Sequence, residues 1–178
     1  MNTPTPEPAD NELREVRDRF IAQWGVMGAA WGINRTMAQI HALLMAAPAP
    51  MSTDEAMAAL LISRGNANTN LRELVGWGLV RVVLRKGDRK EYFEAEKDPW
   101  KIFCIVARER QRREIEPAAQ VLRECAERTA KLKGPEAEAF HGMMQTLGEF
   151  VSVAAATMEK ISRRERSKIV PLLLKVLR

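Results

Sequence analysis

The segment from residue 61 to residue 94 constrains the fold of this chain most strongly, because it places one short helix directly before two strands. Its sequence is LISRGNANTNLRELVGWGLVRVVLRKGDRKEYFE. Ser63 is a suitable N-cap, since its hydroxyl can accept a hydrogen bond from the free N–H groups of a first helical turn. Small or apolar residues then recur at helical spacing, at Ala67, Leu71, Leu74 and Gly78. The pattern predicts a helix that begins after Ser63 and packs through this stripe.

The other side of the predicted helix carries amide, hydroxyl and guanidinium groups. At about 100° per residue, the residues opposite or beside the stripe are Gly65, Asn66, Asn68, Thr69, Arg72 and Glu73. In the major groove of DNA, arginine pairs with guanine, asparagine pairs with adenine, and threonine contacts a base or a phosphate. A merely solvated helix more often carries glutamate and lysine. The face therefore favours DNA reading, with Arg72, Asn66 and Asn68 as the expected base contacts.

A basic β-hairpin is predicted directly after this helix. Arg81 and Arg85 alternate with Val82 and Leu84 in a β-branched run, and residues 86 to 89 supply a turn before an aromatic return strand. Between residues 81 and 90 there is one anion, and the five cations are Arg81, Arg85, Lys86, Arg89 and Lys90. Such a hairpin would suit the phosphate backbone or a narrow minor groove. The plainer interpretation is a solvated, charged hairpin.

Three helices are expected upstream of this segment. The first runs from about residue 10 to residue 25 and is followed by the loop glycines Gly25 and Gly28. The second runs from about residue 34 to residue 47, and the third begins at Ser52, where Ser-Thr-Asp-Glu forms a capping box. Helices followed by a hairpin in this order are the layout of a winged helix-turn-helix.

Long helices are expected downstream. Asp98-Pro99 opens a helix that Pro117 bends, and a last helix runs from about residue 135 to residue 168 before Pro171 breaks it. These helices carry more apolar surface than a winged helix of about 60 residues can cover, so a second copy of the chain is the expected cover. Two-fold pairing would place two reading helices about one DNA turn apart, over a palindromic site.

The predicted fold class is therefore mainly α, a winged helix-turn-helix with a small β-hairpin wing and long flanking dimerisation helices. The predicted domains are a disordered tail at 1–9, a DNA-binding domain at 10–97 and a helical dimerisation region at 98–178.

Composition and spacing argue against other classes of protein. No apolar run approaches the roughly 18 residues of a membrane span, and the N-terminus lacks a signal-peptide pattern, so a cytoplasmic protein without a membrane partner is expected. His41 and His141 each stand alone, and Cys104 and Cys125 lack ligand spacing. No enzyme activity, metal or cofactor is therefore expected. The basic segment 160–178 leaves three interpretations open: a phosphate contact, a membrane-surface helix, or a solvated edge beside a dimer seam.

The motif SRGNANTNLRELVGWGLV, followed by KGDRK and Tyr92-Phe93, resembles the MarR-type winged-helix regulators, and particularly their glycine-betaine-synthesis branch. The resemblance extends from about Gly25 through the helix after Pro99. It implies a dimeric regulator, typically a repressor of a nearby operon that a small molecule releases from double-stranded DNA. By this motif the reading helix carries Arg64, Asn66, Asn68, Thr69 and Arg72, and the wing carries Arg85, Lys86, Arg89 and Lys90. Ala67 departs from the pattern, where a larger apolar residue is usual.

The same resemblance implies a quaternary amine as effector, which would require aromatic faces around the cation. Candidate residues for such a cage are Trp24, Trp31, Trp100 and Phe103. Aromatic residues at helical spacing are more often core residues, so packing is the stronger interpretation of these four.

Two other functions compete with sequence-specific regulation. A winged helix can contact another protein instead of DNA, and a non-specific architectural DNA binder would also be basic. The asparagine, threonine and arginine face favours specific DNA binding, because an architectural protein would carry more lysine and less asparagine there.

Overall fold

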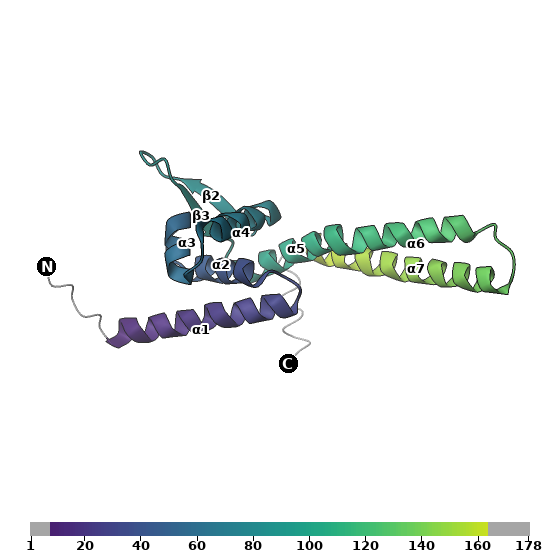
Figure 1. Ribbon diagram of the computed structural model, residues 1–178, viewed down its shortest axis with the longest axis horizontal. Coiled ribbons are helices and arrows are strands. Elements are labelled where there is room, and N and C mark those ends of the chain that lie inside the picture. Colours follow the sequence, from purple (N-terminus) through teal and green to yellow (C-terminus); the bar gives the residue numbers. More distant parts are fainter. Residues whose placement is uncertain (1–7, 164–178) are drawn as a thin grey trace. The chain divides into compact units, whose positions relative to one another are not determined.

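The computed structural model describes residues 8 to 163 (Figure 1), and the chain divides between Lys97 and Asp98 into two compact units. The first unit contains α1 (Pro8–Ala30), α2 (Arg35–Ala46), β1 (Met51–Ser52), α3 (Thr53–Leu60), α4 (Arg64–Trp77), β2 (Val80–Leu84) and β3 (Glu91–Ala95). The second contains α5 (Pro99–Arg110), the π-helical turn η1 (Gln111–Ile115), α6 (Glu116–Thr129) and α7 (Pro135–Arg163). The predicted fold class is confirmed: the chain is mainly helical, with α2, α3 and α4 followed by a β2–β3 wing, and long helices follow the wing.

Side-chain caps fix where several helices begin, as their sequences predict. The Ser52 hydroxyl accepts a hydrogen bond from the Glu55 N–H at 3.3 Å, and the Glu55 carboxylate accepts one from the Ser52 N–H at 2.6 Å. This capping box also lowers the pKa of Glu55, chiefly through the Ser52 backbone N–H. Ser63 caps α4 by accepting from the Asn66 N–H at 3.3 Å, and Asp98 caps α5 with Pro99 in its first turn.

The first helix continues through the two glycines that the sequence predicts to form a loop. Gly25 and Gly28 lie inside α1, where they let it approach α2 closely. A Cβ added at Gly25 would come within 2.6 Å of Gln39 Cγ, and one at Gly28 within 2.6 Å of Ala38 Cβ. The loop prediction is wrong because glycine disfavours an isolated helix by only about 1 kcal/mol, which tight packing can outweigh.

The sheet has a third strand that the sequence pattern does not reveal. β1 pairs antiparallel with β3, so the strand order is β1-β3-β2, with Met51 opposite Phe93 and Ser52 opposite Tyr92. Two residues after a proline-rich loop are too few to show a strand period. Because Ser52 is both a strand residue and the cap of α3, β1 joins the base of the wing to the helix-turn-helix.

The core of the first unit lies between α2, α4 and the inner face of the sheet. Its largest fully buried side chains are Phe93, Met37, Ile40, Leu71 and Leu74. Ala67 is also fully buried, so the small residue at this position fits against its neighbours without leaving the helix face exposed. This core holds α4 and β3 together, and both elements carry the candidate site.

The second unit is a helical hairpin in which α6 and α7 lie side by side (Figure 1). The bend expected at Pro117 corresponds to η1, the π-helical turn just before it, because a proline lacks the N–H that would continue the α-helical ladder. The buried Glu109 accepts hydrogen bonds from Arg112 at 2.6 Å and Arg113 at 2.5 Å beside this turn. The pKa of Glu109 is lowered, chiefly by the Arg112 hydrogen bond.

Some sequence predictions concern residues that lie partly or wholly outside the described part of the chain. The predicted tail at 1–9 falls mostly outside it, although α1 already begins at Pro8. α7 is described to Arg163, so the predicted helix end near Lys168, the break at Pro171 and the larger part of the basic segment 160–178 lie outside the described residues.

Candidate nucleic-acid interface

The structure places most of the polar residues of α4 on its exposed side. All five residues predicted for the reading helix are exposed: Arg64, Asn66, Asn68, Thr69 and Arg72. Two residues depart from the expected pattern. Glu73 is only half-buried rather than fully outward, and Gly78 closes the helix instead of extending its stripe. Gly78 has φ +82°, a left-handed conformation that glycine adopts without strain and that ends the helix.

An ion-pair network links the start of α4 to α3 and the wing. Asp54, in the first turn of α3, contacts the Arg64 guanidinium, and its second carboxylate oxygen lies 3.7 Å from Lys90 Nζ. All three side chains are largely exposed, so these pairs stabilise the fold little and can yield to another anion. Two of the predicted DNA contacts, Arg64 and Lys90, therefore converge on one carboxylate in the free protein.

The side chain of Arg72 contacts two residues of β3. Its guanidinium pairs with the Glu91 carboxylate, with Arg72 Nη1 donating to Glu91 Oε1 at 3.4 Å and Nη2 donating to Oε2. The guanidinium carbon also lies 5.8 Å from the centre of the Phe93 ring, within the range of a cation–π contact. Sequence spacing could not reveal this pair, because the partners are 19 residues apart and meet only through the hairpin.

The asparagines of α4 differ in how free their side chains are. The buried Asn70 donates from Nδ2 to the Asn66 carbonyl at 2.8 Å and to Asn66 Oδ1 at 2.6 Å. Asn66 Oδ1 is therefore engaged, and bidentate pairing of Asn66 with adenine would require Asn70 to release it. Sequence reasoning missed Asn70, although a polar residue on an apolar stripe is the signal that could have identified it. In the described part of the chain, Asn68 and Thr69 have no polar side-chain partner.

The cations of the wing differ in whether their side chains have partners within the described residues. Arg81 pairs with Glu94, with Nε donating at 2.8 Å, and Arg85 lies over the Tyr92 ring at 3.7 Å while donating to the Pro50 carbonyl at 3.1 Å. No ion pair or hydrogen bond is formed by the side chains of Lys86 and Arg89 within residues 8–163. These two cations at the hairpin tip are the ones available to a phosphate without rearrangement.

Asp88 orders the tip of the wing. One oxygen accepts from the Tyr92 hydroxyl at 2.7 Å and the other from the Lys90 backbone N–H at 2.9 Å. These bonds lower the pKa of Asp88, with the tyrosine hydroxyl as the larger cause, and the same bond raises the pKa of Tyr92. Gly87, at φ +85°, supplies the left-handed turn residue. The tip of the wing is thus a defined turn, and the Asp88 carboxylate is engaged in hydrogen bonds within it.

The inner face of the wing is shorter than the sequence alternation implies. Val80 is buried and Val82 and Val83 are half-buried, but Leu84 is 76% exposed. Leu84 lies on the same side of β2 as Val82, but it is uncovered because the hairpin extends beyond the helices that cover its base (Figure 1). Leu84 is therefore an apolar side chain beside the basic tip.

The four aromatic residues of the candidate effector cage belong to different units. In the first unit, Trp24 is half-buried and its ring lies 5.5 Å from Phe20 and 6.4 Å from His41, while Trp31 is 60% exposed. In the second, Trp100 and Phe103 lie 5.4 Å apart. Trp24, Trp100 and Phe103 make ordinary packing pairs within their own units, and a cage that these four residues share stays a prediction.

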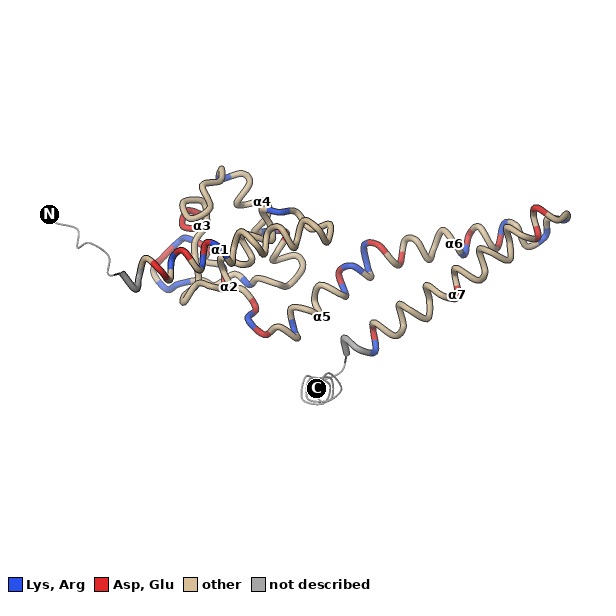
Figure 2. Tube along the Cα trace, turned by 90° about the horizontal axis from the view of Figure 1, so that it is seen from below, with Lys and Arg blue, Asp and Glu red and all other residues tan. Residues whose placement is uncertain are grey.

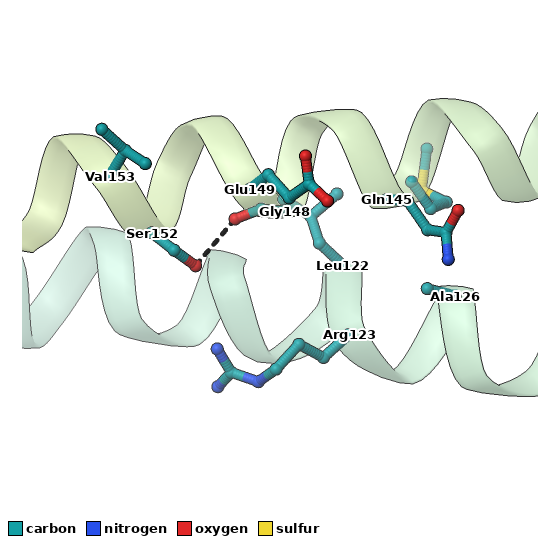
Figure 3. Close-up of a pocket in the computed structure, with 9 residues that line it drawn as sticks. Leu122, Arg123, Ala126, Gln145, Gly148, Glu149, Ser152 and Val153 are labelled. Carbon is teal, nitrogen blue, oxygen red and sulfur yellow. Dashed lines mark hydrogen bonds between the residues drawn. The ribbon is translucent and has the colours of Figure 1, made fainter.

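A groove of about 570 Å³ runs between α6 and α7 in the second unit (Figure 3). Leu122, Ala126 and Gly148 give it an apolar floor, and Arg123 and Glu149 are its charged lining residues. The Ser152 hydroxyl donates to the Gly148 carbonyl of its own helix at 2.7 Å. Among the residues that the structure describes, no group of histidine, cysteine and carboxylate side chains could hold a metal ion, and no helix is long and apolar enough to cross a membrane.

Comparison with solved structures supports the fold. A crystal structure described as that of a transcriptional regulator is similar with a TM-score of 0.55 and 21% sequence identity, over 81% of this chain and 98% of that chain. No protein-family model and no curated protein sequence matches the chain. The likeness therefore shows a shared fold.

Proposed function

We propose that this protein is a sequence-specific DNA-binding transcriptional regulator that acts as a homodimer. The observation that carries the proposal is that one polar helix face and one basic hairpin tip are both exposed on a single compact unit. α4 presents Asn68, Thr69 and Arg72, and the wing presents Lys86 and Arg89. Base-reading groups beside phosphate-binding cations are the two components of a specific protein–DNA interface.

The dimer is proposed through the second unit, residues 98–178. One stripe of α7 packs toward α6, but a second stripe remains exposed along the same helix: Phe140 (47%), Met143 (56%), Leu147 (39%) and Phe150 (71%). Figure 2 shows that charged residues are sparse along most of α7. Four large apolar side chains at three- and four-residue spacing are typical of a helix that packs against another helix. A second copy of the chain supplies an equivalent stripe by two-fold symmetry.

The finer features of the proposal follow the MarR-type resemblance. The regulator is proposed to repress a nearby operon and to be released by a small molecule, with a quaternary amine as the candidate and Trp24, Trp31, Trp100 and Phe103 as its candidate contacts. Aromatic faces attract such cations, and Trp31 and Phe103 are exposed. Calorimetric titration with choline-like amines tests this feature separately, and heat that persists after Trp31→Ala and Phe103→Ala substitutions would argue against the assigned contacts.

Selection of duplexes from a random pool tests the proposed function itself. The pure protein is expected to enrich a palindromic sequence, and fluorescence anisotropy should then give an affinity for it at least about a thousandfold above random duplex at physiological salt. Equal affinity for both duplexes would indicate an architectural protein. No binding to either at low ionic strength would favour the alternative, a winged helix that contacts another protein.

A further inference from the structure

The contact between Arg72 and Glu91 is made across two elements of the DNA-binding unit. Arg72 is an exposed residue of the reading helix α4, and Glu91 is the first residue of β3 in the wing. Phe93, two residues further along β3, lies beneath the same guanidinium. The wing strand therefore fixes the position of an arginine that belongs to the reading helix.

The pair leaves part of the guanidinium free. Arginine has five N–H donors, and Glu91 accepts from one hydrogen on Nη1 and one on Nη2. The Nε–H and the second hydrogen of each terminal nitrogen remain, and Nε with one terminal nitrogen forms a second fork. A fork of two parallel donors is what pairs with O6 and N7 of guanine. Arg72 can thus keep Glu91 and still read a base.

We propose that Glu91 is a positioning residue for base reading, which holds Arg72 in the orientation that pairs with guanine. This inference rests on the proposed function. A free arginine side chain loses rotamer freedom when it binds, and a side chain already restrained by Glu91 and Phe93 loses less. Glu91 acts through Arg72 and makes no contact with DNA of its own.

Two physical effects of Glu91 on DNA binding have opposite signs. Its negative charge repels phosphates, so removing the charge should strengthen binding to every duplex. Its restraint on Arg72 favours the cognate duplex alone, so removing the restraint should weaken cognate binding. Because the two effects change cognate binding in opposite directions, a measurement can distinguish positioning of Arg72 from simple electrostatic repulsion.

Glu94→Gln provides a matched control for Glu91→Gln. Both substitutions remove one negative charge from β3, and both free an arginine from an exposed ion pair. The arginine freed by Glu94→Gln is Arg81 of β2, which is not on the reading helix. A difference between the two variants therefore reports on Arg72 rather than on net charge.

Anisotropy titrations of wild type, Glu91→Gln and Glu94→Gln, with the selected duplex and a random duplex, test the inference. Glu94→Gln should bind both duplexes slightly more tightly and keep the cognate-to-random ratio. Glu91→Gln should lower that ratio roughly two- to fivefold and weaken the preference for guanine at one position of each half-site. In an Arg72→Ala background, Glu91→Gln should change the ratio no more than Glu94→Gln does.

Two outcomes would overturn the inference. If wild type discriminates between the duplexes but Glu91→Gln matches Glu94→Gln, Glu91 does not position Arg72. If wild type itself shows no preference, the proposed function fails and the inference fails with it. Circular dichroism melting of both variants confirms that the surface substitutions leave the fold intact.

Discussion

At the scale of single residues, His41 is the most unusual polar group in the first unit. It is 4% exposed in α2, faces Trp24, and its Nε2 has no hydrogen-bond partner in the described part of the chain. Burial lowers its pKa from the ordinary histidine value of 6.5 to about 4, because the charged imidazolium is poorly solvated there. The neutral ring is therefore the form that the folded protein holds.

The shifted pKa of His41 makes stability depend on pH. Since the unfolded chain takes up a proton near pH 6.5 and the folded chain only near pH 4, the free energy of unfolding is highest above pH 6.5 and falls as the pH drops between these values. The shift corresponds to a loss of about 3 kcal/mol across that window. Urea unfolding of wild type and His41→Phe between pH 4 and 7 measures it. The variant should lose much less stability, and equal losses would show that other groups cause the dependence.

The backbone conformation of Leu61 lowers the stability of the fold. It ends α3 with φ +52° and is 92% exposed, so it gains no burial in return for a left-handed backbone. Leu61→Gly should raise the free energy of unfolding by about 1 kcal/mol, measured by urea unfolding. Gly78→Ala, at φ +82°, should lower it by a similar amount. A destabilised Leu61→Gly variant would mean that the leucine side chain contributes more than its conformation costs.

At the scale of elements, close packing between α1 and α2 depends on glycine. A Cβ at Gly28 would meet Ala38 Cβ at 2.6 Å, whereas one at Gly76 of α4 would meet no atom within 4 Å. Gly28→Ala should therefore destabilise the protein by about 1 to 3 kcal/mol through overpacking. Gly76→Ala should stabilise it by up to about 1 kcal/mol, through helix propensity alone. Thermal melting of the two variants gives the comparison, and a neutral Gly28→Ala would show that the helices can separate without cost.

The elements also show which features of the fold and site are readable from sequence. Ser52, Ser63 and Asp98 predict helix starts because a cap acts over three residues of chain. The exposed face of α4 is readable for the same reason, since helical periodicity is local. The helical glycines of α1, the strand β1 and the Arg72–Glu91 pair are not, because each depends on a neighbour distant in sequence. The residues of the candidate site were accessible from the sequence, but their internal partners were not.

At the scale of the whole molecule, the proposed dimer forms through the exposed apolar stripe of α7. Phe150→Glu, at a side chain that is 71% exposed, should leave each chain folded and shift the protein from dimer to monomer in sedimentation experiments. Gln145→Glu, at an exposed polar position on the opposite side of the same helix from this stripe, is the matched control and should stay dimeric. A Phe150→Glu protein that remains dimeric would exclude this stripe as the interface.

The central claim is that two copies of the chain together bind one duplex through α4 and the wing. Sedimentation velocity of the protein mixed with a fluorescently labelled, selected palindromic duplex tests it most directly. The claim predicts a complex of two chains per duplex that weakens steeply with salt and in which Arg89→Ala releases about one fewer counterion. A monomeric protein that leaves the duplex sedimenting alone at low ionic strength would contradict it.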